Sequence, residues 1–197
     1  MKVIRDLIAN FQQGFFDPEY NDSEDPRYDA LHYPTNSETL FHGHYMTMIS
    51  HNDIQTYPQD LSRALQRLLQ DLKCEELLIS GFVKSELFGN VELRHERLLH
   101  AREILAQKTS SIAGYKEVIR IAVDELEPIM YAFFWLYHLD ASMSTYIFWT
   151  DQQQRFSFYI SNRGNLHWLD LSEQKILSDT IFKEHGFKVG VDINQFL

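Results

Sequence analysis

The sequence predicts an α+β fold, in which several amphipathic helices pack on a C-terminal antiparallel β-meander. One observation is a stripe of apolar residues at helical spacing between Tyr57 and Lys73. The other is a series of aromatic-rich runs, Tyr146–Thr150, Arg155–Ile160 and Leu166–Leu169, separated by short segments of turn-forming residues. A length of 197 residues with 44% apolar content indicates one domain spanning residues 1–197.

The N-terminal part is predicted to contain two helices joined by a long loop. Apolar residues recur at three- and four-residue spacing from Val3 to Phe15, which predicts an amphipathic helix that ends before Pro18. Asp17–Asn36 shows no periodicity and contains three prolines, so it is predicted to be a loop. A capping-box pattern then predicts a second helix over Ser37–Ser50.

The central part is predicted to be mainly helical. The helix from Tyr57 to Lys73 begins with a proline in its first turn, where the missing N–H is tolerated. Glu75–Val83 is apolar and fits either an extension of this helix or a short strand. Further helices are predicted over Val91–Lys108 and Ser111–Leu126.

In the C-terminal part, further elements precede and follow the meander along the chain. Ile129–Tyr137 fits a strand or a buried helix, and we predict a strand because the run is aromatic-rich and follows a proline. After the meander, a helix is predicted to begin at Ser172 and to end at His185-Gly186. The alternating pattern of Phe187–Ile193 fits a final strand.

Aromatic residues are concentrated between Ile129 and Leu171, a stretch that holds all three tryptophans. Aromatic platforms can stack nucleic-acid bases, but such sites also carry basic residues. Only Arg155 and Arg163 lie among these strands. We therefore predict that most of these rings pack in the core. If Trp149 and Trp168 were both exposed, the sheet itself would become the interface candidate.

Charge and composition limit the compartment and the partners. The net charge is −10, and a protein that binds nucleic acid directly normally carries a basic face. Cys74 is the single cysteine, so nothing indicates an oxidising compartment. The N-terminus lacks the apolar core of a secretory signal, and no apolar run reaches the ~20 residues of a membrane span. We therefore expect a cytoplasmic protein without a nucleic-acid or membrane partner.

The negative charge is concentrated in one segment. Seven acids and one base lie between Phe15 and Glu38, which places −6 of the net −10 there. Three tyrosines are interleaved with these acids, and tyrosine with carboxylate suits a basic protein surface. The segment is therefore either a solvated excursion or a recognition loop. The candidate partner-binding residues are Asp17, Glu19, Tyr20, Asp22, Glu24, Asp25, Tyr28, Asp29, Tyr33 and Glu38.

The histidines and the cysteine are the candidates for catalytic chemistry. His42, His44 and His51 are close in sequence, but on the predicted helix His42 and His44 point about 200° apart, whereas in a strand they would share a face. Cys74 lies beside acidic Glu75, which disfavours a thiolate nucleophile. No metal ligand set, cofactor motif or nucleophile elbow is recognised, so no cofactor and no metal is predicted. A hydrolase site at these histidines is the rival hypothesis.

The order of the predicted elements in the C-terminal half resembles that of a known protein family. Asn90–Arg97 opens a charged helix, Tyr115–Val118 follows, and then come Tyr146–Trp149 and Leu166–Asp170. This order is similar to the small acidic immunity proteins of bacterial polymorphic-toxin and contact-dependent growth inhibition systems. The resemblance implies a cytoplasmic antitoxin that binds a cognate basic toxin domain, often a nuclease, and blocks its active site without catalysis. A non-catalytic scaffold protein is a further alternative.

Overall fold

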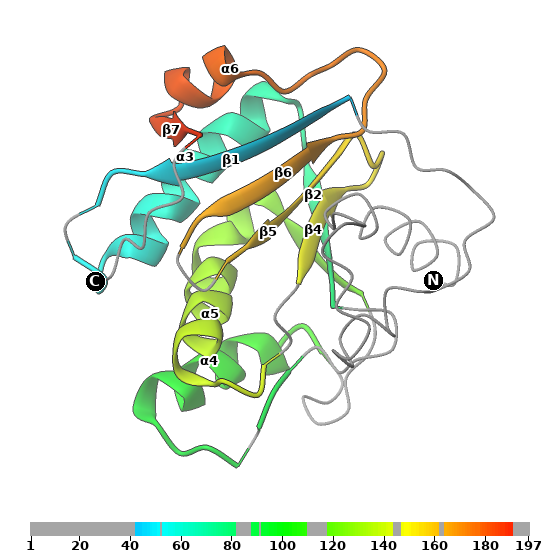
Figure 1. The fold of residues 1–197 in the computed structure, drawn as a ribbon. Coiled ribbons are helices and arrows are strands. Elements are labelled where there is room, and N and C mark those ends of the chain that lie inside the picture. Colours follow the sequence, from blue (N-terminus) through cyan, green and yellow to red (C-terminus); the bar gives the residue numbers. More distant parts are fainter. Residues whose placement is uncertain are drawn as a thin grey trace, which may run out of the picture.

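The structure, a computed structural model, describes residues 42–51, 53–81, 88–90, 92–109, 118–143, 147–161 and 164–190. Within these residues, helices and strands combine in an α+β fold, as predicted (Figure 1). The helices are α3 (Tyr57–Asp71), α4 (Glu96–Ala106), α5 (Leu126–Leu139) and α6 (Asp179–Glu184), with a 3-10 turn, η2, at Val123–Glu125. The strands are β1 (Gly43–Ile49), β2 (Glu76–Ser80), β3 (Ile119–Ala122), β4 (Phe148–Asp151), β5 (Phe156–Ile160), β6 (Leu166–Asp170) and β7 (Phe187–Val189).

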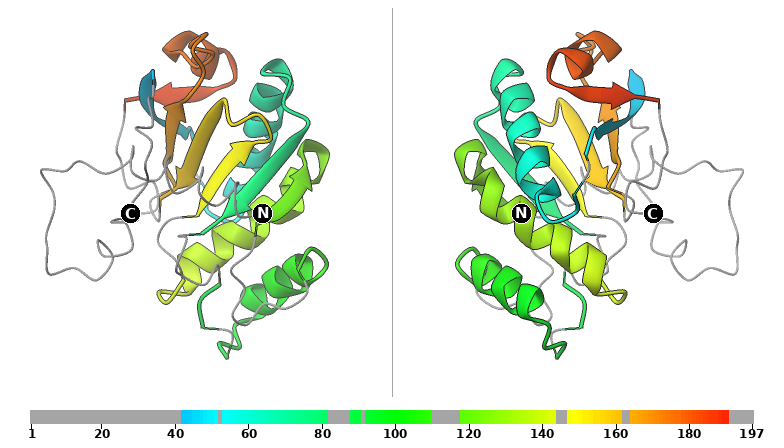
Figure 2. Two further views of the ribbon diagram at one scale, coloured as in Figure 1. Left: turned by 90° about the vertical axis from the view of Figure 1, so that its right-hand side faces the viewer. Right: turned by 90° about the vertical axis from the view of Figure 1, so that its left-hand side faces the viewer.

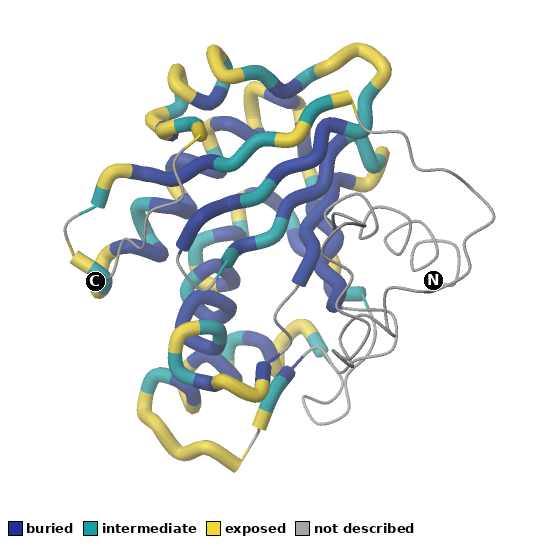
Figure 3. Tube along the Cα trace, viewed as in Figure 1, coloured by how far each residue is buried: buried dark blue, intermediate teal, exposed yellow. Residues whose placement is uncertain are grey.

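The seven strands form one antiparallel sheet in the order β3-β2-β4-β5-β6-β1-β7. The predicted meander is confirmed as β4-β5-β6 at its centre, where the tube in Figure 3 is mostly buried. The strand register aligns one row of side chains across the core face. This row consists of Tyr45, Trp168, Phe158, Trp149 and Ile79. Trp149 and Trp168 are both 0% exposed, so the predicted core role of these rings is confirmed.

Three helices lie on the same side of the sheet as this row. Figures 1 and 2 show α3 and α5 against the sheet and α4 outside α5. Phe133 of α5 meets the Trp149 ring edge-on, with the ring centroids 5.3 Å apart. Helix α3 confirms the predicted amphipathic helix, and its leucine stripe, including Leu61, Leu65 and Leu68, is fully buried.

The strand predicted for Ile129–Tyr137 is wrong, because this segment belongs to helix α5. Buried residues lie all around α5, since the sheet covers one side and α3 and α4 cover others. An apolar run that is buried on several sides lacks the period that separates helices from strands. Pro128 lies in the first turn of α5, where a proline removes no helical hydrogen bond.

The helix predicted for Ser37–Ser50 is wrong over the part that the structure describes, where strand β1 spans Gly43–Ile49. Strand β1 pairs with β6 on one side and β7 on the other, and this pairing satisfies the hydrogen-bonding groups of its backbone. The Thr47 hydroxyl also accepts a hydrogen bond of 3.0 Å from the indole N–H of Trp168. These long-range partners outweigh a local capping pattern, because propensity is a weak prior against tertiary contacts.

The helix predicted for Ser111–Leu126 is also wrong from Ile119 onward, where β3 and η2 precede α5. Ile119 and Ile121 are buried while Arg120 between them is exposed, which is the alternation of a strand with one covered face. Strand β3 pairs with β2. The segment Glu75–Val83, which fitted either a helical extension or a strand, is therefore a strand over Glu76–Ser80.

Two helices begin later than predicted, because their capping residues lie further along the chain. Helix α4 begins at Glu96, where the His95 ring accepts a hydrogen bond from the Arg97 amide. Helix α6 begins at Asp179 after an N-cap at Ser178, and Gly186 follows its end with φ +86°. The predicted final strand is present as β7 within the described residues.

Two predicted elements, the helix at Val3–Phe15 and the loop at Asp17–Asn36, lie outside the described residues. Among the helices that the structure describes, none is long and apolar enough to cross a membrane.

Candidate functional site

The predicted partner-binding segment from Asp17 to Glu38 lies wholly outside the described residues. The described part contains two polar pockets and several histidines. Their side chains are candidates for a functional site.

The three histidines of the rival hypothesis lie at the two ends of β1. His44 is near the start of the strand and His51 follows its end, so the part of β1 from His44 to Ile49, roughly 17 Å at ~3.3 Å per residue, lies between them. His44 stacks with His167 at a centroid distance of 6.3 Å, and burial lowers the pKa of His44. His51 instead contacts Asp60 of α3, with Nδ1 3.4 Å from Oδ2. The structure therefore does not bring His44 and His51 together.

The described part of the chain offers no cluster of metal ligands. No group of three or more histidine, cysteine, aspartate or glutamate side chains there has the geometry to hold a metal ion.

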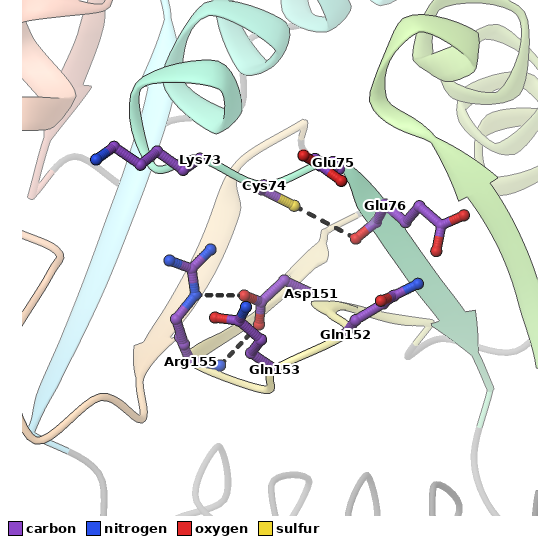
Figure 4. A pocket seen from close by; sticks show the side chains of 8 residues that line it. All are labelled: Lys73, Cys74, Glu75, Glu76, Asp151, Gln152, Gln153 and Arg155. Carbon is purple, nitrogen blue, oxygen red and sulfur yellow. Dashed lines mark hydrogen bonds and ion pairs between the residues drawn. The ribbon is translucent and has the colours of Figure 1, made fainter.

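The first pocket lies where the link from α3 to β2 meets the β4–β5 turn, and we call it the β2–β4 pocket (Figure 4). The antiparallel register pairs Leu77 with Asp151, which brings the start of β2 beside the end of β4. The cavity measures about 180 Å³. Its lining residues are Lys73, Cys74, Glu75, Glu76, Asp151, Gln152, Gln153 and Arg155.

A buried carboxylate fixes the turn beneath the β2–β4 pocket. The Asp151 side chain is 3% exposed, and its Oδ1 accepts a hydrogen bond of 2.7 Å from the Arg155 backbone N–H. Its Oδ2 accepts a second bond of 2.6 Å from Arg155 Nε. Gln154 adopts φ +56° to close this turn. The guanidinium of Arg155 is thereby held in one orientation, and its terminal nitrogens have no hydrogen-bond partner among the described residues.

Cys74 contributes a thiol to this lining, and its environment keeps that thiol protonated. Burial, together with the negative charge of Asp151, raises the pKa of its thiol to about 12. The thiol donates a weak hydrogen bond to the Glu76 carbonyl at 3.3 Å. Because the thiolate is the reactive form, this cysteine is unsuited to nucleophilic catalysis at neutral pH.

The charges of the β2–β4 pocket are divided between its sides. Figure 4 shows Lys73 and Arg155 on one side and Glu75 and Glu76 on the other. Glu76 also lies 3.8 Å from Arg120 of β3. This arrangement can bind a polar group, and the Asp151 carboxylate within it is already paired with Arg155.

The second pocket lies between α3, the end of β1 and the turn from α6 to β7, and we call it the α3–β7 pocket. Its cavity measures about 240 Å³. Its lining residues are Ile49, Ser50, Asp60, Arg63, Ala64, Arg67, His185 and Gly186. His185 and Gly186 are far in the sequence from the other lining residues, which all lie between Ile49 and Arg67.

Sequence reasoning did not identify either pocket. Asp151 and Arg155 are four residues apart across a predicted turn, and that spacing was the available signal for a carboxylate that anchors the turn. The α3–β7 pocket left no comparable signal, because its two walls are 118 residues apart between Arg67 and His185. Comparison with protein-family models, with curated proteins and with solved structures finds no match.

Proposed function

We propose that this chain is an immunity protein that binds a cognate basic toxin domain, a nuclease, and blocks its active site without catalysing a reaction. The observation that carries the proposal is the composition of the segment from Phe15 to Glu38, which contains seven acids and one base in a chain of net charge −10. The order of elements expected from the sequence of the C-terminal half, which resembles that of immunity proteins of bacterial toxin systems, motivates the same assignment.

Electrostatics explains why such a segment suits a nuclease. A nuclease active site is basic because it must hold phosphate groups. An acidic surface is attracted to that site, and charge complementarity raises the association rate well above that of neutral partners. Tyrosines interleaved with the acids add apolar contact area with few rotatable bonds, as in other recognition surfaces. The protein would act in the cytoplasm, where it protects the cell's own nucleic acid.

The two pockets described above are small. Their cavities of about 180 and 240 Å³ are smaller than the ~300–1,000 Å³ of typical small-molecule sites. Cys74 stays protonated, and His44 and His51 lie at opposite ends of β1.

The test compares two variants that each remove four negative charges. The first replaces Asp22, Asp25 and Asp29 by asparagine and Glu24 by glutamine. The matched control replaces four exposed acids elsewhere, namely Glu92, Asp124, Glu173 and Glu184, by the corresponding amides. The binding partner is the inactivated product of the neighbouring gene, which the proposal expects to encode a toxin domain. Calorimetry measures the affinity at low and high salt.

The first variant should bind at least about tenfold more weakly than the control variant, with a smaller salt dependence, because it removes charges at the contact. Equal effects of the two variants would remove the segment from the interface. No binding of the neighbouring gene product by the unaltered protein would refute the proposed function.

A further inference from the structure

One face of α3 carries a stripe of four charged residues. Asp60, Arg63, Arg67 and Asp71 are spaced three, four and four residues apart, which places them on the same side of the helix. The two acids lie at the ends of this α3 stripe and the two arginines lie between them.

Histidines from outside the helix contact both ends of the α3 stripe. His51, which follows β1, has Nδ1 3.4 Å from Oδ2 of Asp60. His185, which follows α6, has Nε2 3.3 Å from Oδ2 of Asp71. The stripe therefore faces the β1–β7 edge of the sheet along its length, and the α3–β7 pocket lies over its central arginines.

The two arginines are only partly neutralised. Arg63 lies 3.4 Å from Asp60, but both side chains are exposed and Asp60 also contacts His51. Arg67 has no hydrogen bond or ion pair with any residue that the structure describes. Buried Ala64 lies between them on the lining, so a small side chain leaves the space beside both guanidinium groups open.

The two pockets differ in the sign of their charge. In the α3–β7 pocket, two arginines outnumber one aspartate, which leaves a formal charge of +1 with the histidine neutral. In the β2–β4 pocket, Lys73 and Arg155 face three carboxylates, which leaves −1. A positive pocket is unusual in a chain with a net charge of −10. The two arginines of this lining favour anions, and Asp71 lies beside it, against His185.

We propose that the α3–β7 pocket binds an oxyanion, a carboxylate or a phosphate group, between the guanidinium groups of Arg63 and Arg67. The planar fork of arginine matches the oxygens of both groups and can donate two parallel hydrogen bonds. A cavity of about 240 Å³ holds on the order of eight waters at ~30 Å³ each, which suits a small anion or a single acidic group. This proposal does not depend on the proposed function.

The experiment titrates the full chain with inorganic phosphate and, separately, with succinate, at an ionic strength held constant with sodium chloride. Calorimetry or amide chemical shifts should show saturable binding at one site. Arg67→Gln and Arg63→Gln should each weaken that binding at least about tenfold, because charge-assisted hydrogen bonds are lost. The control is Arg94→Gln, which removes an exposed positive charge ahead of α4 and should leave the affinity unchanged.

The outcomes separate the ligand class from the existence of the site. Phosphate binding alone assigns a phosphate site, and binding of succinate assigns carboxylate recognition; both support the proposal. Absence of saturable binding of either anion overturns it. Equal weakening by Arg67→Gln and Arg94→Gln also overturns it, because net charge rather than the pocket would then be responsible. Thermal melting of each variant checks that it is folded.

Discussion

Replacing Arg155 by alanine should lower the free energy of unfolding by about 3 kcal/mol, because a buried carboxylate loses its counter-charge. The Asp151 side chain is 3% exposed and its Oδ2 lies 2.6 Å from Arg155 Nε. The backbone N–H of residue 155, which donates to Oδ1 at 2.7 Å, survives the substitution. The expected loss therefore lies at the low end of the ~3–5 kcal/mol measured when one partner of a buried ion pair is removed.

The matched control is Lys183→Ala, which breaks another pair at the same four-residue spacing. Asp179 and Lys183 are 59% and 64% exposed, and their charged atoms lie 3.8 Å apart. Exposed pairs on a helix contribute about 0.3–0.5 kcal/mol, because solvent screens them. The control variant should therefore lose less than about 0.5 kcal/mol.

Denaturant unfolding followed by tryptophan fluorescence measures both losses. Trp135, Trp149 and Trp168 are at most 2% exposed, so unfolding moves every tryptophan from the core into water. Similar losses in the two variants would refute the reasoning, because burial would then make no difference to an ion pair of this spacing. A loss below about 1 kcal/mol for Arg155→Ala would show that water reaches the carboxylate after the substitution.

Two further predictions concern buried groups. Thr47→Val should lower the free energy of unfolding by about 1–3 kcal/mol, since the buried Trp168 N–H loses its acceptor, whereas Thr47→Ser should retain most of the stability in the same unfolding assay. The Cys74 thiol, whose pKa is raised from 9.0 to about 12, stays protonated in the folded state while the unfolded thiol ionises. The free energy of unfolding should therefore fall between pH 9 and about pH 12, and Cys74→Ala should remove this part of the pH dependence; an unchanged pH profile in that variant would contradict the assignment.

The candidate sites were predictable to different extents. The acidic segment from Phe15 to Glu38 is visible in the sequence, because charge density needs no tertiary information. The α3–β7 pocket was not visible, because Arg67 and His185 come together only when β7 pairs with β1. The turn anchored by Asp151 lies between these cases, since its two residues are near neighbours but the burial of the carboxylate depends on β2.

The sequence by itself determined the α+β class, the helix α3 and the meander β4-β5-β6. Each of these follows from a local pattern, an apolar stripe at helical spacing or short aromatic runs separated by turns. Only the tertiary structure decided that Gly43–Ile49 and Ile119–Ala122 are strands and that Leu126–Leu139 is a helix. Long-range strand pairing stabilises the two strands. The helix is buried on several sides, so its sequence lacks the polar–apolar period that would have identified it as a helix.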